Sequence, residues 1–363
     1  MEEHNSVYRI LDASFNRASE GLRTLEEAGR FALNHSELAS EFKELRHGLA
    51  SSMEALPRGE LIRSRDTTSD VGTEIQADSE YRRQSIESVV IAAASRVQQS
   101  VRVLEEYMKV IDASPAKKLE KIRYRIYTAC ASLELKVRSN EIQQALADSH
   151  LYLLLDAADS DLEFERRMTE LIDSGIDIVQ LRDRGVSDRT LLRRARIGVR
   201  IARDAGKLFI VNDRADLALA ADADGVHVGQ EELPAIDARR ILGSDRIIGV
   251  STHSLEEAKQ AVSDGADYIG CGPVFPSQTK AFKHFVGVDM LREVASMVQV
   301  PSFAIGGIDS SNLGQIIDGG FYRVAVSNAI HAASHPVKTA NEIKRVLKEA
   351  ASRLSPTSKV VQE

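Results

Sequence analysis

The chain has 363 residues and a formal net charge of −7, with 43% apolar and 28% charged residues. At about 100–200 residues per domain, this length predicts two domains, each with its own core. The acidic balance excludes a general basic footprint for nucleic acid, and two cysteines exclude a disulfide framework or a cysteine-built zinc site. There is no leader pattern and no apolar run of about 18 residues, so we expect a soluble, cytoplasmic protein without membrane contact.

Residues 1–145 are predicted to form an all-helical domain. Apolar residues recur there at three- and four-residue spacing, as in Leu22 and Leu25 and again in Val97 and Val101. The segment NRASEGLRTLEE (16–27) is repeated as SRVQQSVRVLEE (95–106), and FKELRH (42–47) as LEKIRY (119–124). A repeated helix pair predicts a bundle with a pseudo-twofold axis.

Residues 146–355 are predicted to form a (β/α)8 barrel, followed by a flexible tail at 356–363. Short apolar runs alternate with amphipathic stretches, as expected for parallel strands that helices cover on the outside. A doubly wound sheet is the alternative, but no G-x-G-x-x-G follows the first run. The eight runs are 151–156, 176–183, 208–213, 225–229, 246–252, 268–275, 301–307 and 322–330.

The loops after the strands of such a barrel carry its chemistry, because all strands end at the same mouth. The loops after the early strands come first. Gln180, Arg182 and Arg184 share one face at the end of the second run, and guanidinium groups suit phosphate oxygens. Asp213 and Glu232 follow the third and fourth runs, and two carboxylates can hold one Mg²⁺ together with substrate phosphates. These residues predict a metal–diphosphate site.

The later loops predict a second anion site. Gly307 follows the seventh run and Ser327 precedes a helix after the eighth, which is the common phosphate-binding corner of these barrels. The fifth run ends at Ser251, and the sixth leads into a lid-like segment with two hydroxyls and an ammonium group, from Ser277, Thr279 and Lys280. Two anion sites indicate two phosphorylated small-molecule substrates, one of them a diphosphate.

These residues resemble those of the thiamine-phosphate synthase family. The matching motifs are QLRDR, VNDRADLALAADADGVHVGQEELP, IGVSTHS, GADYIGCGPVFPSQTK, FAIGGI and VAVSNAI, and their order spans the barrel. The resemblance implies that the barrel joins hydroxymethylpyrimidine diphosphate to hydroxyethyl-methylthiazole phosphate and releases diphosphate. The implied reaction is an Mg²⁺-dependent group transfer in which positioning and charge neutralisation supply most of the catalysis. The implied catalytic residues are Arg182, Arg184, Lys280 and Ser251.

The resemblance also implies the roles of individual residues. Ser251 faces the pyrimidine and Mg²⁺ is held by Asp213 and Glu232, whereas the other contacts divide between the two phosphorylated groups. The implied diphosphate contacts are Gln180, Arg182, Arg184, Asn212 and Lys280. The implied thiazole-phosphate contacts are Ser277, Thr279, Gly307, Val326 and Ser327.

The chain departs from the family at three of these positions. The family usually has Lys at position 184, Asp at position 232 and Thr at position 277. Arg184 keeps the positive charge with a different geometry, Glu232 is one methylene longer, and Ser277 keeps the hydroxyl. We expect His227 and Cys271 to line the barrel without acting as nucleophiles. A thiazole tautomerase-like barrel is the alternative reading; it needs a general base but neither a diphosphate nor a metal site.

The helical half resembles the small domain of monofunctional hydroxymethylpyrimidine-phosphate kinases, on NRASEGLRTLEEAGRF, RDTTSDVGT and SRVQQSVRVLEE. The resemblance implies ATP with Mg²⁺ as a substrate and a product that the barrel consumes. No P-loop motif is present. The candidate site consists of repeated helix arginines and residues of the loop between the repeats: Arg17, Arg23, Arg96, Arg102, Arg65, Asp66 and Asp70.

Two alternatives remain open for the whole chain. The helical half can be a non-catalytic module for oligomerisation or regulation, which leaves a homo-oligomer open. The protein can also be a non-enzymatic binder of thiamine precursors.

Overall fold

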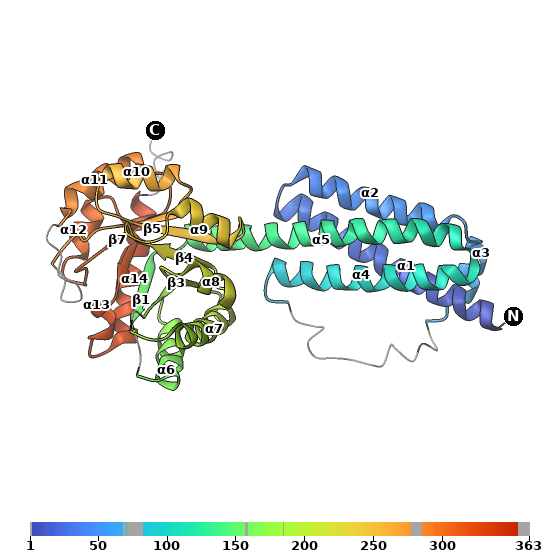
Figure 1. Ribbon diagram of the computed structural model, residues 1–363, viewed down its shortest axis with the longest axis horizontal. Helices are drawn as coiled ribbons and strands as arrows, with labels where there is room; N and C mark the ends of the chain where they lie inside the picture. Colours follow the sequence, from blue (N-terminus) through green and yellow to red (C-terminus); the bar gives the residue numbers. More distant parts are fainter. Residues whose placement is uncertain are drawn as a thin grey trace. The chain divides into compact units, whose positions relative to one another are not determined.

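A computed structural model describes residues 2–67, 70, 83–156, 159–183, 185–276 and 285–354. The chain divides into two compact units, Met1–Asn140 and Glu141–Glu363, and helix α5 (Ala113–Ala147) crosses the division (Figure 1). The tail predicted at 356–363 lies outside the described residues. None of the described helices is long and apolar enough to cross a membrane.

The first unit is helical in its described residues, as the periodicity predicts (Figure 1). Leu22, Leu25, Val97 and Leu104 are fully buried in its core, so the repeated apolar positions face inward. Its elements before α5 are α1 (Glu2–Glu27), a short π-helix (Ala28–Ala32), α2 (Ser36–Met53), α3 (Arg58–Ser64) and α4 (Ile86–Ile111).

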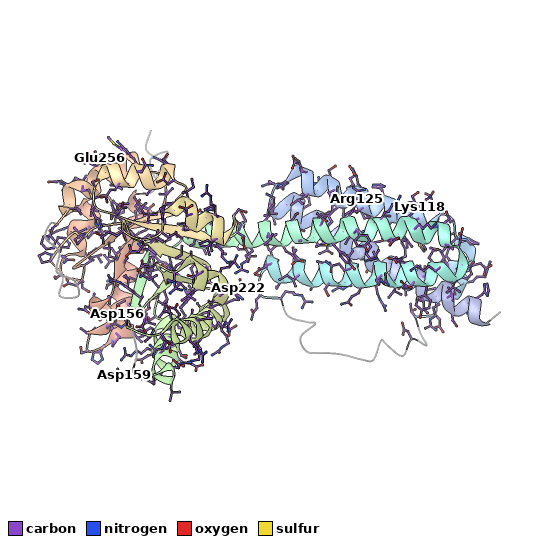
Figure 2. The ribbon with its side chains drawn as sticks, viewed as in Figure 1. Lys118, Arg125, Asp156, Asp159, Asp222 and Glu256 are labelled. Atoms are coloured by element: carbon purple, nitrogen blue, oxygen red, sulfur yellow. The ribbon has the colours of Figure 1, made fainter. Side chains whose placement is uncertain are left out.

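The internal repeat is visible in a pair of buried ion pairs. Glu26 of α1 accepts a hydrogen bond from Arg46 Nε of α2 at 3.1 Å, and Glu105 of α4 accepts one from Arg123 Nε of α5 at 2.6 Å. The four residues occupy corresponding places in the repeated segments. Each helix pair therefore carries the same link between a buried carboxylate and the following helix. A further pair joins the two repeats, between Arg125 of α5, which is labelled in Figure 2, and Glu41 of α2.

The second unit is a closed barrel of eight parallel strands in sequence order, as predicted. Its strands are β1 (Leu151–Asp156), β2 (Ile178–Arg182), β3 (Leu208–Asn212), β4 (Gly225–Val228), β5 (Ile247–Thr252), β6 (Tyr268–Cys271), β7 (Ser302–Ile305) and β8 (Val324–Val326). The helices are α6 (Asp161–Ile172), α7 (Asp188–Asp204), α8 (Ala215–Ala221), α9 (Ala235–Leu242), α10 (Leu255–Ser263), α11 (Gly287–Met297), α12 (Leu313–Asp318), α13 (Asn328–His331) and α14 (Pro336–Leu354).

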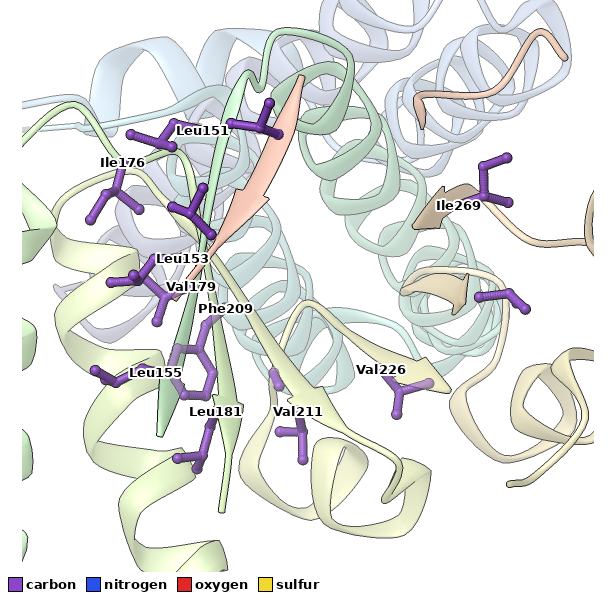
Figure 3. Close-up of a cluster of buried hydrophobic side chains, with 14 of the residues drawn as sticks. Leu151, Leu153, Leu155, Ile176, Val179, Leu181, Phe209, Val211, Val226 and Ile269 are labelled. Atoms are coloured by element: carbon purple, nitrogen blue, oxygen red, sulfur yellow. The ribbon is translucent and has the colours of Figure 1, made fainter. Parts of the chain in front are cut away.

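Alternate strand residues face two separate cores. Leu151, Leu153 and Leu155 of β1 pack with the surrounding helices, as Figure 3 shows for this cluster. Tyr152 and Leu154 belong to the cluster inside the barrel. Because both faces of each strand are buried, the strands appear in the sequence as nearly continuous runs of apolar residues.

The end of the barrel opposite the strand carboxyl ends is closed by the last turns of α5 and by acidic residues. Ile142 and Leu146 pack into the inner cluster. Asp177 precedes β2, accepts hydrogen bonds from His150 N and Leu151 N, and pairs with Lys344 of α14. These contacts close this end of the barrel.

Candidate functional site

A cavity of about 700 Å³ opens at the carboxyl ends of the strands. Residues from every strand, or from the loop after it, line this cavity. The cavity therefore lies at the strand carboxyl ends, where the sequence predicts the site. Nine sequence-predicted residues line it: Gln180, Arg182, Asn212, Asp213, Glu232, Ser251, Gly307, Val326 and Ser327. The remaining four predicted residues, Arg184, Ser277, Thr279 and Lys280, lie outside the described residues.

Arg182 is the basic side chain that the end of β2 brings to this cavity. It is half-buried and makes no ion pair with any residue that the structure describes, so its guanidinium can bind a ligand anion. The next residue, Asp183, is buried and pairs with Arg194 Nη1 of α7 at 2.7 Å. This pair anchors the loop after β2, and sequence reasoning missed it because nothing marks which distant arginine meets Asp183.

Two carboxylates, Asp213 and Glu232, line the cavity after β3 and β4. Asp213 has a left-handed backbone (φ 62°), and its N–H donates to His227 O at 2.8 Å. The Glu232 carboxylate lies over Gly229, where an added Cβ would approach its Oε2 to 2.3 Å. No group of three or more metal-ligating side chains occurs in the part of the chain that the structure describes. This oxygen-only, two-carboxylate donor set fits Mg²⁺, which shares its ligands with water and substrate phosphates.

The opposite side of the cavity is built from the ends of β7 and β8. Gly306 and Gly307 both have positive φ, at 97° and 65°, and Phe275 N donates to Gly306 O, so the segment after β6 runs beside them. Ser327 precedes α13, and its Oγ donates at 3.3 Å to Oδ2 of Asp156 at the end of β1. Asp156 is labelled in Figure 2. Glycine backbone and a serine hydroxyl thus line this corner of the cavity, and such groups suit the binding of a phosphate.

Ser251 of β5 lies at the cavity beside a buried histidine. Its Oγ is 2.9 Å from His227 Nε2 of β4, and the other ring nitrogen, Nδ1, is 3.1 Å from Tyr268 Oη. Burial, followed by the positive charge of Arg182, lowers the pKa of His227 to about 4. His227 is therefore neutral at physiological pH.

The expectation that both His227 and Cys271 line the barrel is half right. His227 lines the cavity, but Cys271 belongs to the core between the strands and the helices, and Thr252 donates to its sulfur. Burial raises the pKa of the Cys271 thiol to about 12. In a barrel whose strands are apolar on both faces, the sequence does not mark which alternate residue points inward.

The repeated arginines of the helical unit differ in their environment. Arg23 pairs with Glu26 and Glu27, and Arg102 pairs with Glu105 and Glu106, so both are held by their own helices. Arg17 and Arg96 are exposed and make no ion pair with a described residue. No contact between described residues joins the four arginines.

The loop residues of the predicted helical site lie near α1. Arg65 holds Asp12 through two hydrogen bonds of 2.8 Å, and Arg9 donates to the backbone oxygen of Asp66 at 2.8 Å. The described part of this loop is thus attached to α1. Asp70 is described, whereas residues 68–69 and 71–82 are not.

Two family models match the chain. The model described as thiamine monophosphate synthase matches residues 151–330, and the model of the ThiD2 family matches residues 9–132. The two matches correspond to the barrel and to the helical unit.

Curated relatives match nearly the whole chain. The thiamine-phosphate synthase of Rhodopirellula baltica is 44% identical over 362 residues, covering 98% of this chain and 96% of the relative. That of Nostoc punctiforme is 43% identical over 330 residues, covering 91% of each. The solved thiamine phosphate pyrophosphorylase from Pyrococcus furiosus has a TM-score of 0.50 and 32% identity, covering 58% of this chain and 98% of that one.

Proposed function

Because the chain belongs to the thiamine-phosphate synthase family, we propose that its barrel joins hydroxymethylpyrimidine diphosphate to hydroxyethyl-methylthiazole phosphate and releases diphosphate. The observation that carries this assignment is one cavity that Arg182 lines together with the carboxylates of Asp213 and Glu232. A tautomerase-like barrel needs neither a diphosphate nor a metal site, so this combination disfavours that alternative.

The basic side of the cavity binds the diphosphate in this proposal. Arg182, the last residue of β2, supplies the described guanidinium, and the Asp183–Arg194 pair holds the residue that follows it. Asn212 adds an amide at the end of β3. Arg184 and Lys280, which lie outside the described residues, complete the charge that a leaving diphosphate requires.

Asp213 and Glu232 are the residues that would hold Mg²⁺. When bound, the metal ion neutralises charge on the diphosphate and so makes it a better leaving group. Glu232 is one methylene longer than the usual family aspartate. Its position over Gly229 supports the view that the longer side chain folds back toward the strand end.

The corner formed by Gly307, Val326 and Ser327 binds the thiazole phosphate. Ser277 and Thr279, outside the described residues, belong to the same proposed contact set. With the two phosphates fixed on opposite sides of one cavity, the thiazole nitrogen is held near the pyrimidine methylene carbon. Positioning of this kind replaces covalent catalysis, because capture of a pyrimidine-stabilised cation needs no protein nucleophile.

The synthase proposal is tested with the full chain, both phosphorylated precursors and Mg²⁺, by measuring diphosphate release and thiamine phosphate. We expect Arg182→Ala to remove most activity while leaving the unfolding midpoint unchanged. Arg189→Ala, an exposed arginine at the start of α7, is the matched control and retains activity. Absence of product from the wild-type chain would reject the synthase, and an inactive but unfolded Arg182→Ala would make Arg182 structural.

For the helical unit we propose a kinase that transfers phosphate from ATP to hydroxymethylpyrimidine phosphate, producing the diphosphate that the barrel uses. The match of residues 9–132 to the ThiD2 family supports it. The exposed Arg17 and Arg96 support anion binding more than Arg23 and Arg102, whose charges are already paired.

The kinase is tested separately on the Arg182→Ala variant of the full chain. We expect ADP to form only when pyrimidine phosphate and Mg²⁺ are both present, because the helical unit is unaltered. Substituting Arg17 and Arg96 together should then lower this rate. No ADP formation would favour a non-catalytic module for oligomerisation or regulation.

A further inference from the structure

A continuous chain of hydrogen bonds crosses the interior of the barrel, and its residues line the cavity. Gln180 Nε2 donates to Tyr152 Oη at 2.8 Å, and Tyr152 Oη lies 2.9 Å from Tyr268 Oη. Tyr268 Oη is 3.1 Å from His227 Nδ1, and His227 Nε2 is 2.9 Å from Ser251 Oγ. Five strands, β2, β1, β6, β4 and β5, thus contribute one residue each to a single path.

We propose that the hydrogen bonds of this path all donate in one direction, from Gln180 toward Ser251. In that arrangement His227 is held as the Nε2–H tautomer, and the Ser251 hydroxyl proton is left for the substrate. His227, Tyr268 and Tyr152 are then positioning residues that act through Ser251. The proposal rests on the proposed role of Ser251 at the pyrimidine.

The number of protons on each group fixes which atom donates in every hydrogen bond of the path. The Gln180 amide nitrogen can only donate, so the Tyr152 oxygen accepts, and its proton goes to the Tyr268 oxygen. The Tyr268 proton then goes to His227 Nδ1, which must be unprotonated. A neutral imidazole carries its one proton on the other nitrogen, Nε2, which donates to Ser251 Oγ.

The opposite tautomer leaves a buried proton unused. If His227 Nδ1 donated to Tyr268, the Tyr268 proton would go to Tyr152, which already accepts from Gln180. The Tyr152 hydroxyl proton would then have no acceptor, although this side chain is almost fully buried. An unsatisfied buried donor costs about 1–3 kcal/mol, so the direction that uses every proton is favoured.

The surrounding packing prevents the rings from turning away. Phe303 of β7 packs edge-on against both tyrosines, with ring centroids 5.4 Å from Tyr152 and 5.7 Å from Tyr268. Gly249 of β5 leaves the space for the Tyr268–His227 contact. A Cβ there would lie 2.1 Å from Tyr268 Cζ and 2.5 Å from His227 Nδ1.

This direction determines which kind of ligand atom can bind to Ser251. With Ser251 Oγ accepting from His227, its remaining proton can be donated into the cavity that Ser251 lines. A ligand atom that faces Ser251 must then be an acceptor, as a pyrimidine ring nitrogen or a diphosphate oxygen is.

The tautomer can be measured without any activity. In the full chain labelled with ¹⁵N-histidine, the two ring nitrogen shifts of His227 report which nitrogen is protonated. The signals that disappear in His227→Gln identify the residue. We expect a protonated Nε2 and an unprotonated Nδ1, and a protonated Nδ1 would overturn the inference.

A kinetic experiment tests the effect on Ser251. Tyr268→Phe removes the proton that His227 Nδ1 accepts, and we expect kcat to fall about tenfold, the effect of one hydrogen bond, with KM for the thiazole phosphate unchanged. Tyr322→Phe is the control, because Tyr322 packs on His150 and Arg323 outside the chain of hydrogen bonds. An unchanged kcat in Tyr268→Phe, with an active wild type, would overturn the inference.

Two histidine variants separate positioning from packing. Gln at position 227 keeps an N–H donor near Ser251, whereas Leu keeps apolar volume without a donor. We expect His227→Gln to retain at least ten times the kcat of His227→Leu, and equal loss in both would contradict the proposal. If the wild-type chain forms no thiamine phosphate, the proposed function fails while the tautomer measurement still decides this inference.

Discussion

Asp183 and Arg194 form an ion pair in which both side chains are almost completely buried, at 0% and 4% exposure. The pair connects the loop after β2 with helix α7 on the outside of the barrel. Asp183 stands next to Arg182, so this buried contact sets where the proposed diphosphate arginine leaves the strand. Arg194 also contacts Asp161 at 3.0 Å, which extends the link to α6.

Removing one partner of the Asp183–Arg194 pair is predicted to lower the free energy of unfolding. Asp183→Ala leaves the Arg194 charge buried with a weaker partner, which is expected to destabilise the fold by about 3–5 kcal/mol. Synthase activity should also fall, because the loop that directly follows Arg182 loses its anchor. Urea unfolding and the diphosphate-release assay measure both effects. Arg193→Ala, an exposed partner of Asp161, is the control, and an equal effect there would contradict this account.

The two ion pairs of the helical repeat provide a matched comparison. Glu105 and Arg123 are 3% and 9% exposed, whereas Arg46, which pairs with Glu26, is 28% exposed. Arg123→Ala should therefore lower the free energy of unfolding more than Arg46→Ala, since Glu105 is more deeply buried than Glu26 and would keep only its exposed partners Arg102 and Lys109. Chemical unfolding monitored in the helical unit tests the order, and a larger loss in Arg46→Ala would contradict it.

Gly249→Ala is predicted to disrupt the barrel interior. Its methyl group would overlap the Tyr268 ring and the His227 imidazole, so strands must shift or the hydrogen-bond chain must break. We expect a lower melting temperature together with a lower kcat. Gly314→Ala on α12 meets nothing within 4 Å and should be neutral or slightly stabilising. Similar behaviour of the two variants would show that Gly249 is not constrained by its neighbours.

The metal assignment predicts a changed Mg²⁺ requirement. Asp213→Asn removes one anionic oxygen ligand, so the Mg²⁺ concentration for half-maximal synthase activity should rise. Glu231→Gln changes an exposed carboxylate that lines the same cavity and should leave this concentration unaltered. If Asp213→Asn responds to Mg²⁺ as the wild type does, Asp213 is not a ligand.

Both cysteines are predicted to resist alkylation in the folded protein. Burial raises the pKa of Cys130 to about 11 and that of Cys271 to about 12. At pH 8 only about one thiol in a thousand or fewer is the reactive thiolate, and its fraction rises only as pH approaches the raised pKa. Mass spectrometry after iodoacetamide treatment should show no labelling at pH 8 until denaturant is added. Rapid native labelling of either residue would contradict its buried position.

The sequence alone determined the barrel and the main residues at its mouth. Eight buried-type runs in order predicted eight parallel strands, and strand carboxyl ends necessarily meet at one edge. Gln180, Arg182, Asp213, Glu232 and Ser251 were therefore predicted to meet, and the structure brings these five to one cavity. Hydrophobic periodicity also predicted the helical half, because both patterns depend on residues close together in the chain.

Only the tertiary structure decided which side chains pair inside and between these elements. Strands buried on both faces carry apolar residues on both sides, so the sequence could not show that Tyr152, Tyr268 and His227 face inward while Cys271 faces the helices. Likewise, Arg23 and Arg17 are both arginines of one helix, yet only Arg23 is held by glutamates. Partners of this kind depend on distances across the fold, which the order of residues does not specify.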